Sequence, residues 1–144
     1  MYNGHKIGVV IPAYNVEKFI KDTIEEVPAF VDRIYIVDDG CYDNTANVVQ
    51  VISNHKVHLV RHERNKGPGA ATVTGYQAAL KDKMDIVVKL DGDGQMPSER
   101  IEKLIMPIVG KRVDYTKGDR LSNPDQRGNM PKFRLLGNIL LTGL

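Results

Sequence analysis

Short apolar runs alternate with amphipathic segments along the chain. The runs are rich in β-branched residues and predict buried strands over residues 7–11, 33–37, 57–60 and 86–90. The segments between and after them repeat apolar residues at helical spacing and predict helices over about residues 16–27, 45–52, 70–81 and 101–108. Strands this apolar are typical of a sheet covered on both sides. The pattern therefore predicts an α/β fold, a mostly parallel sheet with helices on both faces.

Each predicted strand runs into a polar turn that contains glycine or proline. We refer to these as the first turn (residues 12–15), the second turn (38–40), the third turn (62–67) and the fourth turn (91–95). In open parallel sheets, ligands bind beyond the carboxyl ends of the strands. We therefore expect the fold to gather all four turns into one binding site.

The fourth turn carries the most specific chemistry. Asp91 and Asp93 follow a buried strand directly, and the carboxamide of Gln95 comes two residues later. Hard oxygen ligands of this kind suit Mg²⁺ or Mn²⁺, which bind through one or two carboxylates together with substrate phosphates. An ordinary acidic surface turn would not explain why a buried strand ends in two carboxylates. The turn therefore predicts a metal–diphosphate site and a nucleotide-activated substrate.

The other turns offer groups that suit a nucleotide. Tyr14 can stack on a base, and Asn15 can contact the ligand or cap the next helix. Asp39 can accept the imide N–H of uracil or the N–H groups of guanine, and capping of a turn is the simpler alternative for it. Lys66 and Gly67 lie in a glycine-rich loop that opens a helix, whose N-terminus favours anions.

Composition places the chain among globular proteins. It has 144 residues, of which 42% are hydrophobic and 26% charged, and this suits a single domain over residues 1–144. The one cysteine, Cys41, excludes an internal disulfide and fits a reducing compartment. No signal-peptide segment opens the chain, and no apolar stretch reaches the roughly 20 residues that span a bilayer.

The net charge of +2 is unevenly distributed. From Lys111 onward there are seven bases and three acids, so this segment carries +4 and the preceding part −2. Such a segment suits phosphates or an anionic membrane surface, and equally a solvated loop. The histidines show no metal-ligand spacing, and Cys41 has no thiol partner, so none of these residues is assigned a role. The dinucleotide G-x-G-x-x-G and the Walker lysine motif are both absent, and nothing indicates binding of nucleic acid.

On these residues, the chain closely resembles family 2 glycosyltransferases. The stretches that match in order and spacing are residues 11–15, 37–45, 65–67 and 91–97. The Asp-Gly-Asp-Gly-Gln turn is most similar to the branch of polyprenyl (dolichyl) phosphate sugar transferases, as are residues 117–120 and 130–138. The resemblance implies a Rossmann-like glycosyltransferase A fold, a UDP- or GDP-linked sugar donor, Mn²⁺ or Mg²⁺, and inversion at the anomeric carbon.

The resemblance also implies roles for individual residues. Nucleotide binding falls to the first three turns and to the first carboxylate of the fourth: Pro12, Tyr14, Asn15, Asp39, Lys66, Gly67 and Asp91. Asp93, Gln95 and Asp91 would hold the metal, which neutralises charge on the leaving diphosphate. Lys117, Arg120 and Arg134 would meet the acceptor phosphate. The implied catalytic set is Asp91, Asp93 and Arg120.

The resemblance favours transfer to a polyprenyl phosphate at the cytoplasmic face of a membrane, with peripheral membrane contact. Such an acceptor is already an anionic nucleophile and needs no general base. A saccharide hydroxyl, the alternative acceptor in cell-surface polysaccharide synthesis, needs a carboxylate base, which in relatives lies downstream of the position of Leu144. The chain ends inside a predicted amphipathic helix over residues 133–144, so we expect a truncated domain with a complete donor half and a partial acceptor half.

Two further classes stay open at this point. A sugar-1-phosphate nucleotidyltransferase shares metal and nucleotide chemistry, but it would carry a basic glycine-rich loop where this chain has residues 11–15. A non-catalytic fragment would bind nucleotide and metal without turnover. Release of sugar from the donor separates that fragment from an active enzyme.

Overall fold

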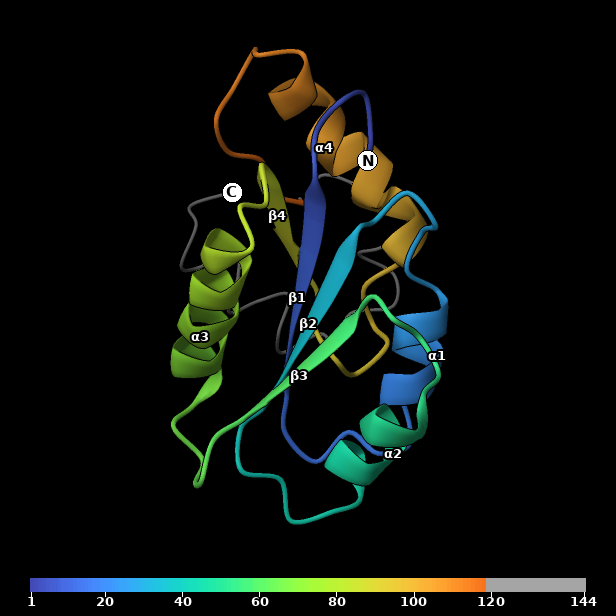
Figure 1. Ribbon diagram of the computed structural model, residues 1–144, viewed down its shortest axis with the longest axis vertical. Coiled ribbons are helices and arrows are strands. Elements are labelled where there is room, and N and C mark those ends of the chain that lie inside the picture. The colour runs from blue at the N-terminus through green and yellow to red at the C-terminus, as the bar shows by residue number, and fades with distance from the viewer. Residues whose placement is uncertain (119–144) are drawn as a thin grey trace, which may run out of the picture. The chain divides into compact units, whose positions relative to one another are not determined.

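The computed structural model describes residues 1–118, of which Met1–Asp114 form one compact unit (Figure 1). Strands and helices alternate along this unit as the hydrophobic pattern predicts. In chain order they are β1 (Ile7–Ala13), α1 (Ile20–Glu25), β2 (Arg33–Asp38), α2 (Thr45–Val51), β3 (Val57–Arg61), α3 (Pro68–Lys81), β4 (Ile86–Lys89), the 3₁₀ turn η1 (Ser98–Arg100) and α4 (Ile101–Val109).

The four strands form one sheet in the order β3-β2-β1-β4, and every neighbouring pair is parallel. β1 lies at the centre, where Val10 pairs with Tyr35 of β2 on one side and with Lys89 of β4 on the other. The predicted parallel α/β sheet is confirmed. Because all strands run the same way, their carboxyl ends and the four turns meet at one edge of the sheet, the lower end in Figure 1.

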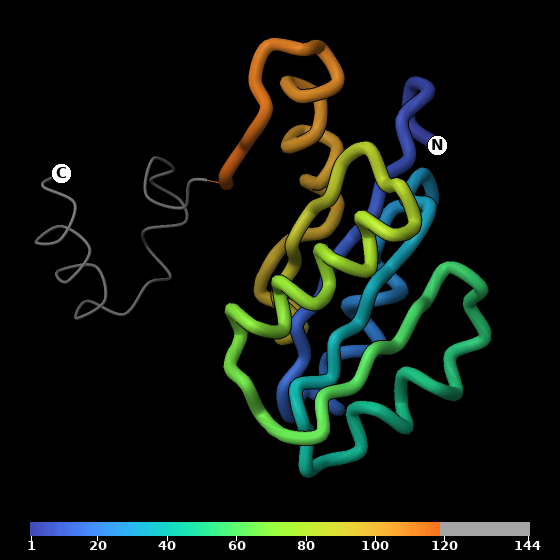
Figure 2. Tube along the Cα trace, turned by 60° about the vertical axis from the view of Figure 1, so that its left-hand side comes forward, coloured from blue at the N-terminus to red at the C-terminus, as the bar shows by residue number. Residues whose placement is uncertain are grey.

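Successive side chains of β1 point to opposite faces of the sheet, so the core has one part on each face. Ile7, Val9 and Ile11 are buried in the larger cluster, which also contains residues of α1, α2 and α4. Val10 points the other way and forms a smaller cluster with Tyr35 and with residues of α3. Figures 1 and 2 show α3 on one side of the strands and α1 and α2 on the other. Each fully buried isoleucine contributes about 1.5–3 kcal/mol to folding, so this two-sided core fixes the strand register.

Helix α3 lies close to the sheet because it carries a glycine at the contact. A Cβ atom at Gly75 would lie 2.3 Å from Cγ1 of Val10. No side chain larger than hydrogen fits there without displacing the helix. The position of α3 matters for the site, because its first residue, Pro68, directly follows the third turn.

The starts of α1 and α2 both lack a standard side-chain cap. Asn15 does not cap α1: its Oδ1 accepts the N–H of Tyr42 at 2.9 Å, and the N-cap position of α1 is Phe19. Asp43 lies one residue before the N-cap position of α2, and its Oδ1 accepts the N–H of Thr45 at 3.0 Å. In both cases a hydrogen bond between or beside the turns takes the place of a standard cap.

Candidate active site

Contacts join the four turns into one continuous edge. A Cβ at Gly92 would lie 3.3 Å from the carbonyl oxygen of Pro12, so the fourth turn lies against the first. Asn15 in the first turn accepts the N–H of Tyr42, just after the second. Asp39 in the second turn accepts N–H groups from the third. The predicted gathering of the turns is therefore observed in the structure.

Asp39 is the central side chain of this edge. Its side chain is 3% exposed, and its Oδ1 accepts the N–H of Lys66 at 2.9 Å, while Oδ2 accepts the N–H of Gly67 at 2.8 Å. Nδ1 of His62 lies 2.6 Å from the same Oδ1. Burial by itself would raise the pKa of Asp39, but the bonds from His62, Lys66 and Gly67 together hold that pKa below its ordinary value. The carboxylate is therefore ionised at neutral pH.

The second and third turns also touch through their backbones. Gly40 has a φ of +70°, and a Cβ at this position would lie 2.6 Å from the carbonyl carbon of Arg64 and from the nitrogen of Asn65. Both the left-handed conformation and the close approach require glycine. Asp39 and Gly40 thus hold the third turn from two sides, by hydrogen bonds and by direct packing.

The neighbouring Asp38 has a different set of partners. It is fully buried, and its carboxylate accepts the N–H of Cys41 at 2.8 Å and Nε of Arg61 at 3.0 Å. This closes the turn and ties it to the end of β3. Burial, followed by the hydrogen bond with Asp38, raises the pKa of the Cys41 thiol to about 11, which makes this cysteine a poor nucleophile at neutral pH.

Two aromatic rings stand at the solvent side of the first and second turns. The rings of Tyr14 and Tyr42 meet edge to face, with centroids 6.3 Å apart. Tyr42 is 87% exposed and Tyr14 is exposed as well. The sequence predicts a stacking role for Tyr14 alone, and Tyr42 is an additional ring that a planar base can contact.

In the fourth turn, the first carboxylate has a partner of its own. Asp91 forms an ion pair with Lys89, the last residue of β4. Oδ1 of Asp93 accepts the N–H of Gln95 at 3.1 Å, and Gln95 is exposed. Within residues 1–118, no group of three or more acidic, histidine or cysteine side chains is arranged as a complete metal cage. An all-oxygen set of two carboxylates and a carboxamide still fits a hard cation that takes its remaining ligands from water and substrate phosphates.

The predicted acceptor residues are described only in part. Lys117 is exposed and lies in irregular chain after Asp114. Arg120 and Arg134 lie outside the described residues. Among residues 1–118, no helix combines the length and apolar character needed to cross a membrane.

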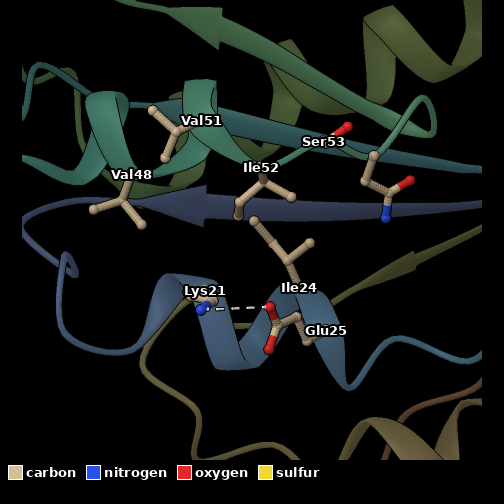
Figure 3. A pocket seen from close by; sticks show the side chains of 8 residues that line it. Lys21, Ile24, Glu25, Val48, Val51, Ile52 and Ser53 are labelled. Atoms are coloured by element: carbon tan, nitrogen blue, oxygen red, sulfur yellow. Dashed lines mark ion pairs between the residues drawn. The ribbon is translucent and has the colours of Figure 1, made fainter.

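A groove in the described part of the chain lies away from the four turns. It runs between α1 and α2, where Ile24, Val48 and Ile52 form its apolar wall (Figure 3). Lys21 and Glu25 pair at its rim. None of the predicted site residues lines this groove, so the chemistry of the four turns and the groove are separate features.

Three residues of the site were missed by sequence reasoning: His62, Lys89 and Tyr42. His62 joins Asp39 to Thr74, since its Nε2 lies 2.9 Å from the hydroxyl of Thr74 on α3. His62 is 23 residues from Asp39 and 12 residues from Thr74, so no local sequence pattern predicts these contacts. The available signal was position alone, because each of the three follows or ends a strand at the carboxyl edge.

Comparison with known proteins decides the family. The family model described as "Glycosyl transferase family 2" matches residues 8–141. This chain belongs to glycosyl transferase family 2. The family predicted from the residues of the four turns is therefore confirmed.

Relatives of this family 2 glycosyltransferase include proteins named for lipid-linked acceptors. It is 38% identical to a UDP-N-acetylglucosamine–dolichyl-phosphate N-acetylglucosaminyltransferase of Methanococcus voltae, with 94% of this chain and 60% of the relative covered. It is 31% identical to a dolichol-phosphate mannosyltransferase of Pyrococcus furiosus, with 82% of this chain and 36% of the relative covered. The chain thus spans three-fifths or less of the length of these relatives.

A solved structure supports the fold assignment. Glucosyl-3-phosphoglycerate synthase from Mycobacterium tuberculosis, crystallised with Mn²⁺, UDP and glucosyl-3-phosphoglycerate, is 25% identical and superposes with a TM-score of 0.59. The similarity covers 74% of this chain and 40% of the synthase. The predicted glycosyltransferase A fold is confirmed by this match.

Proposed function

We propose that this glycosyltransferase binds a nucleotide-diphospho-sugar at the carboxyl edge of its sheet and that the whole protein passes the sugar to a polyprenyl phosphate. The observation that carries the proposal is the contact between neighbouring turns. The Asp91–Asp93 turn lies against Pro12, the first turn bonds to Tyr42, and Asp39 in the second turn bonds to the third. Residues 1–144 would form one catalytic domain that includes the whole donor half.

The donor would lie across all four turns. Tyr14 and Tyr42 present exposed rings for the base, and Pro12 and Asn15 lie in the same turn as Tyr14. Asp39 shapes the third turn, so that the backbone of Lys66 and Gly67 and the start of α3 approach the diphosphate side. Two relatives bear on this arrangement: one is named for UDP-N-acetylglucosamine, and the other was crystallised with UDP.

Asp93 and Gln95, joined by Asp91, would hold Mn²⁺ or Mg²⁺. A bound divalent ion supplies positive charge to the leaving diphosphate, a Lewis-acid contribution of several kcal/mol. Lys89 keeps Asp91 oriented by its ion pair, and Asp93, which accepts only a backbone N–H among the described residues, would be the main ligand of the metal. The M. tuberculosis synthase was crystallised with Mn²⁺ together with UDP, which supports a shared site for metal and nucleotide.

Transfer to a polyprenyl phosphate needs a single displacement. A phosphate oxygen of the acceptor forms a bond to the anomeric carbon on the side opposite the nucleotide. The bond from that carbon to the diphosphate breaks at the same time, and the diphosphate keeps the electron pair, so the configuration inverts. The basic residues Lys117, Arg120 and Arg134 would bind the acceptor phosphate, at the cytoplasmic face of a membrane.

Thermal unfolding of the chain with UDP, GDP, CDP and dTDP, each with and without Mn²⁺, tests the donor site. A ligand that binds only the folded state stabilises it by about 2.7 kcal/mol at one hundred times its dissociation constant. We expect a metal-dependent rise in the melting temperature with one of these nucleotides. No shift with any of them would reject the proposed donor site. Transfer of labelled sugar from the matching donor to polyprenyl phosphate or to a saccharide then identifies the acceptor.

A further inference from the structure

A buried chain of hydrogen bonds connects the sheet edge to α3 through His62. The side chain of His62 is 6% exposed, with Nδ1 at 2.6 Å from Asp39 and Nε2 at 2.9 Å from the hydroxyl of Thr74. An ionised carboxylate only accepts, so Nδ1 donates to Asp39. In the neutral imidazole, Nε2 then accepts the hydroxyl proton of Thr74.

This arrangement fixes how Asp39 presents its oxygens. A carboxylate offers about four acceptor positions, two on each oxygen. His62 and the N–H of Lys66 occupy Oδ1, and the N–H of Gly67 occupies one position on Oδ2. Without the imidazole, the carboxylate would lose its side-chain partner and could rotate away from the two backbone groups.

The same contacts close a loop through the third turn. His62 begins that turn, Lys66 and Gly67 end it, and α3 carries Thr74 less than two helical turns from its start. Asp39 therefore holds the end of the turn, while His62 fastens Asp39 to the helix that follows. The position of the backbone at residues 66 and 67 therefore depends on Asp39, which bonds to it directly, and on His62, which holds Asp39.

We infer that His62 is a positioning residue for nucleotide binding, acting through Asp39 on the backbone of Lys66 and Gly67. The inference rests on the proposed donor site, because the third turn is one wall of that site. It goes beyond the predicted set of residues, in which no histidine has a role. According to this inference, nucleotide binding depends on the hydrogen bond that Nδ1–H donates to Asp39, and the size of the ring is not what matters.

Two substitutions separate these roles of the imidazole. His62→Asn places an amide nitrogen near the position of Nδ1 and keeps the donor to Asp39. His62→Gln carries its amide further out, near the position of Nε2, and keeps only the bond to Thr74. His55→Gln is the matched control, since His55 is exposed and lies outside the four turns.

The first measurement needs no ligand. Amide hydrogen exchange of Lys66 and Gly67 is followed by NMR in each variant. We expect His62→Gln to speed exchange at both amides by about tenfold, as for loss of one hydrogen bond to a charged group. His62→Asn and His55→Gln should leave them close to wild type. Equal exchange in the two His62 variants would overturn the inference.

The second measurement is the dissociation constant of the nucleotide diphosphate that stabilises the wild type, with Mn²⁺, well below each melting temperature. We expect His62→Gln to weaken binding by about tenfold and His62→Asn by less than about threefold. A purely structural role would lower both melting temperatures and leave both constants unchanged, which would contradict the inference. If the wild type binds no nucleotide, the donor-site proposal fails, and amide exchange still decides whether His62 holds the turn.

Discussion

Asp39 accepts the backbone N–H of Gly67 at 2.8 Å, and this bond joins the end of β2 to the residue that precedes α3. The two residues are 28 positions apart in the sequence. The third turn of the site is therefore held by a side chain from the second. Its shape depends on one buried carboxylate, and this makes the site sensitive to changes at Asp39.

Replacing this carboxylate should cost stability. Asp39→Asn keeps the size of the side chain but turns an acceptor oxygen into a donor that faces N–H groups. One unsatisfied buried group costs about 1–3 kcal/mol, so we expect a loss of that size in the free energy of unfolding. Urea denaturation measures it. Asp22→Asn, at an exposed position of α1, is the control and should stay within about 0.5 kcal/mol of wild type.

Acid should weaken the fold through the same residue. The pKa of Asp39 lies below its ordinary value in the folded chain, as does that of Asp43, which bonds to Thr45. The unfolded chain therefore binds protons first, so this stability is present above about pH 4 and is lost as the pH falls through the folded-state pKa. Unfolding free energies at pH 7, 5 and 3 should show a smaller acid loss in Asp39→Asn than in wild type. Parallel pH profiles would count against this role of Asp39.

Two glycines of α3 should respond in opposite ways to alanine. At Gly75 the new methyl group would lie 2.3 Å from Val10, and overpacking of this kind costs about 1–3 kcal/mol. At Gly69 nothing lies within 4 Å of the new Cβ. Gly69→Ala should therefore be neutral or stabilise by up to about 1 kcal/mol, because alanine favours the helix. Thermal unfolding of the pair tests the close contact of α3 with β1, and equal effects would argue against it.

The thiol of Cys41 should react slowly. Its pKa of about 11 leaves less thiolate at pH 8 than a free cysteine has, by about two orders of magnitude. Alkylation by iodoacetamide should be slower than that of a model thiol by this factor, and it should approach the model rate in urea. Rapid alkylation of the folded chain would show that Asp38 and burial do not protect the thiol.

Much of this fold could be predicted because β1 and β2 are apolar on both faces and each turn is marked by glycine, proline or acid. The strand that differed most is β1, which continues through Pro12 to Ala13 although a proline normally stops a central strand. β4 pairs with β1 only as far as Val10, so from Ile11 onward β1 has β2 as its one neighbour in the sheet. A proline is tolerated at such an edge position. Position 12 lies at the edge only because β4 is short, and β4 comes more than 70 residues later in the chain.

The candidate site, like the fold, could be predicted from the sequence only in part. The sequence placed Tyr14, Asp39 and the Asp91–Asp93 turn at one edge, because parallel strands bring their ends together. It could not pair Asp39 with His62 or Asp91 with Lys89, since these contacts depend on side-chain directions in the folded chain. The roles of these residues toward nucleotide, metal and acceptor remain predictions.

The most direct test of the account is calorimetric titration of the stabilising nucleotide diphosphate into wild type and Asp93→Asn, with and without Mn²⁺. Asp22→Asn is the matched control for loss of one exposed negative charge. We expect Mn²⁺ to raise the affinity of wild type and of Asp22→Asn by about tenfold or more, and to have no effect on Asp93→Asn at an unchanged melting temperature. An equal effect of Mn²⁺ on all three proteins would contradict the assignment of the fourth turn as the metal–diphosphate site.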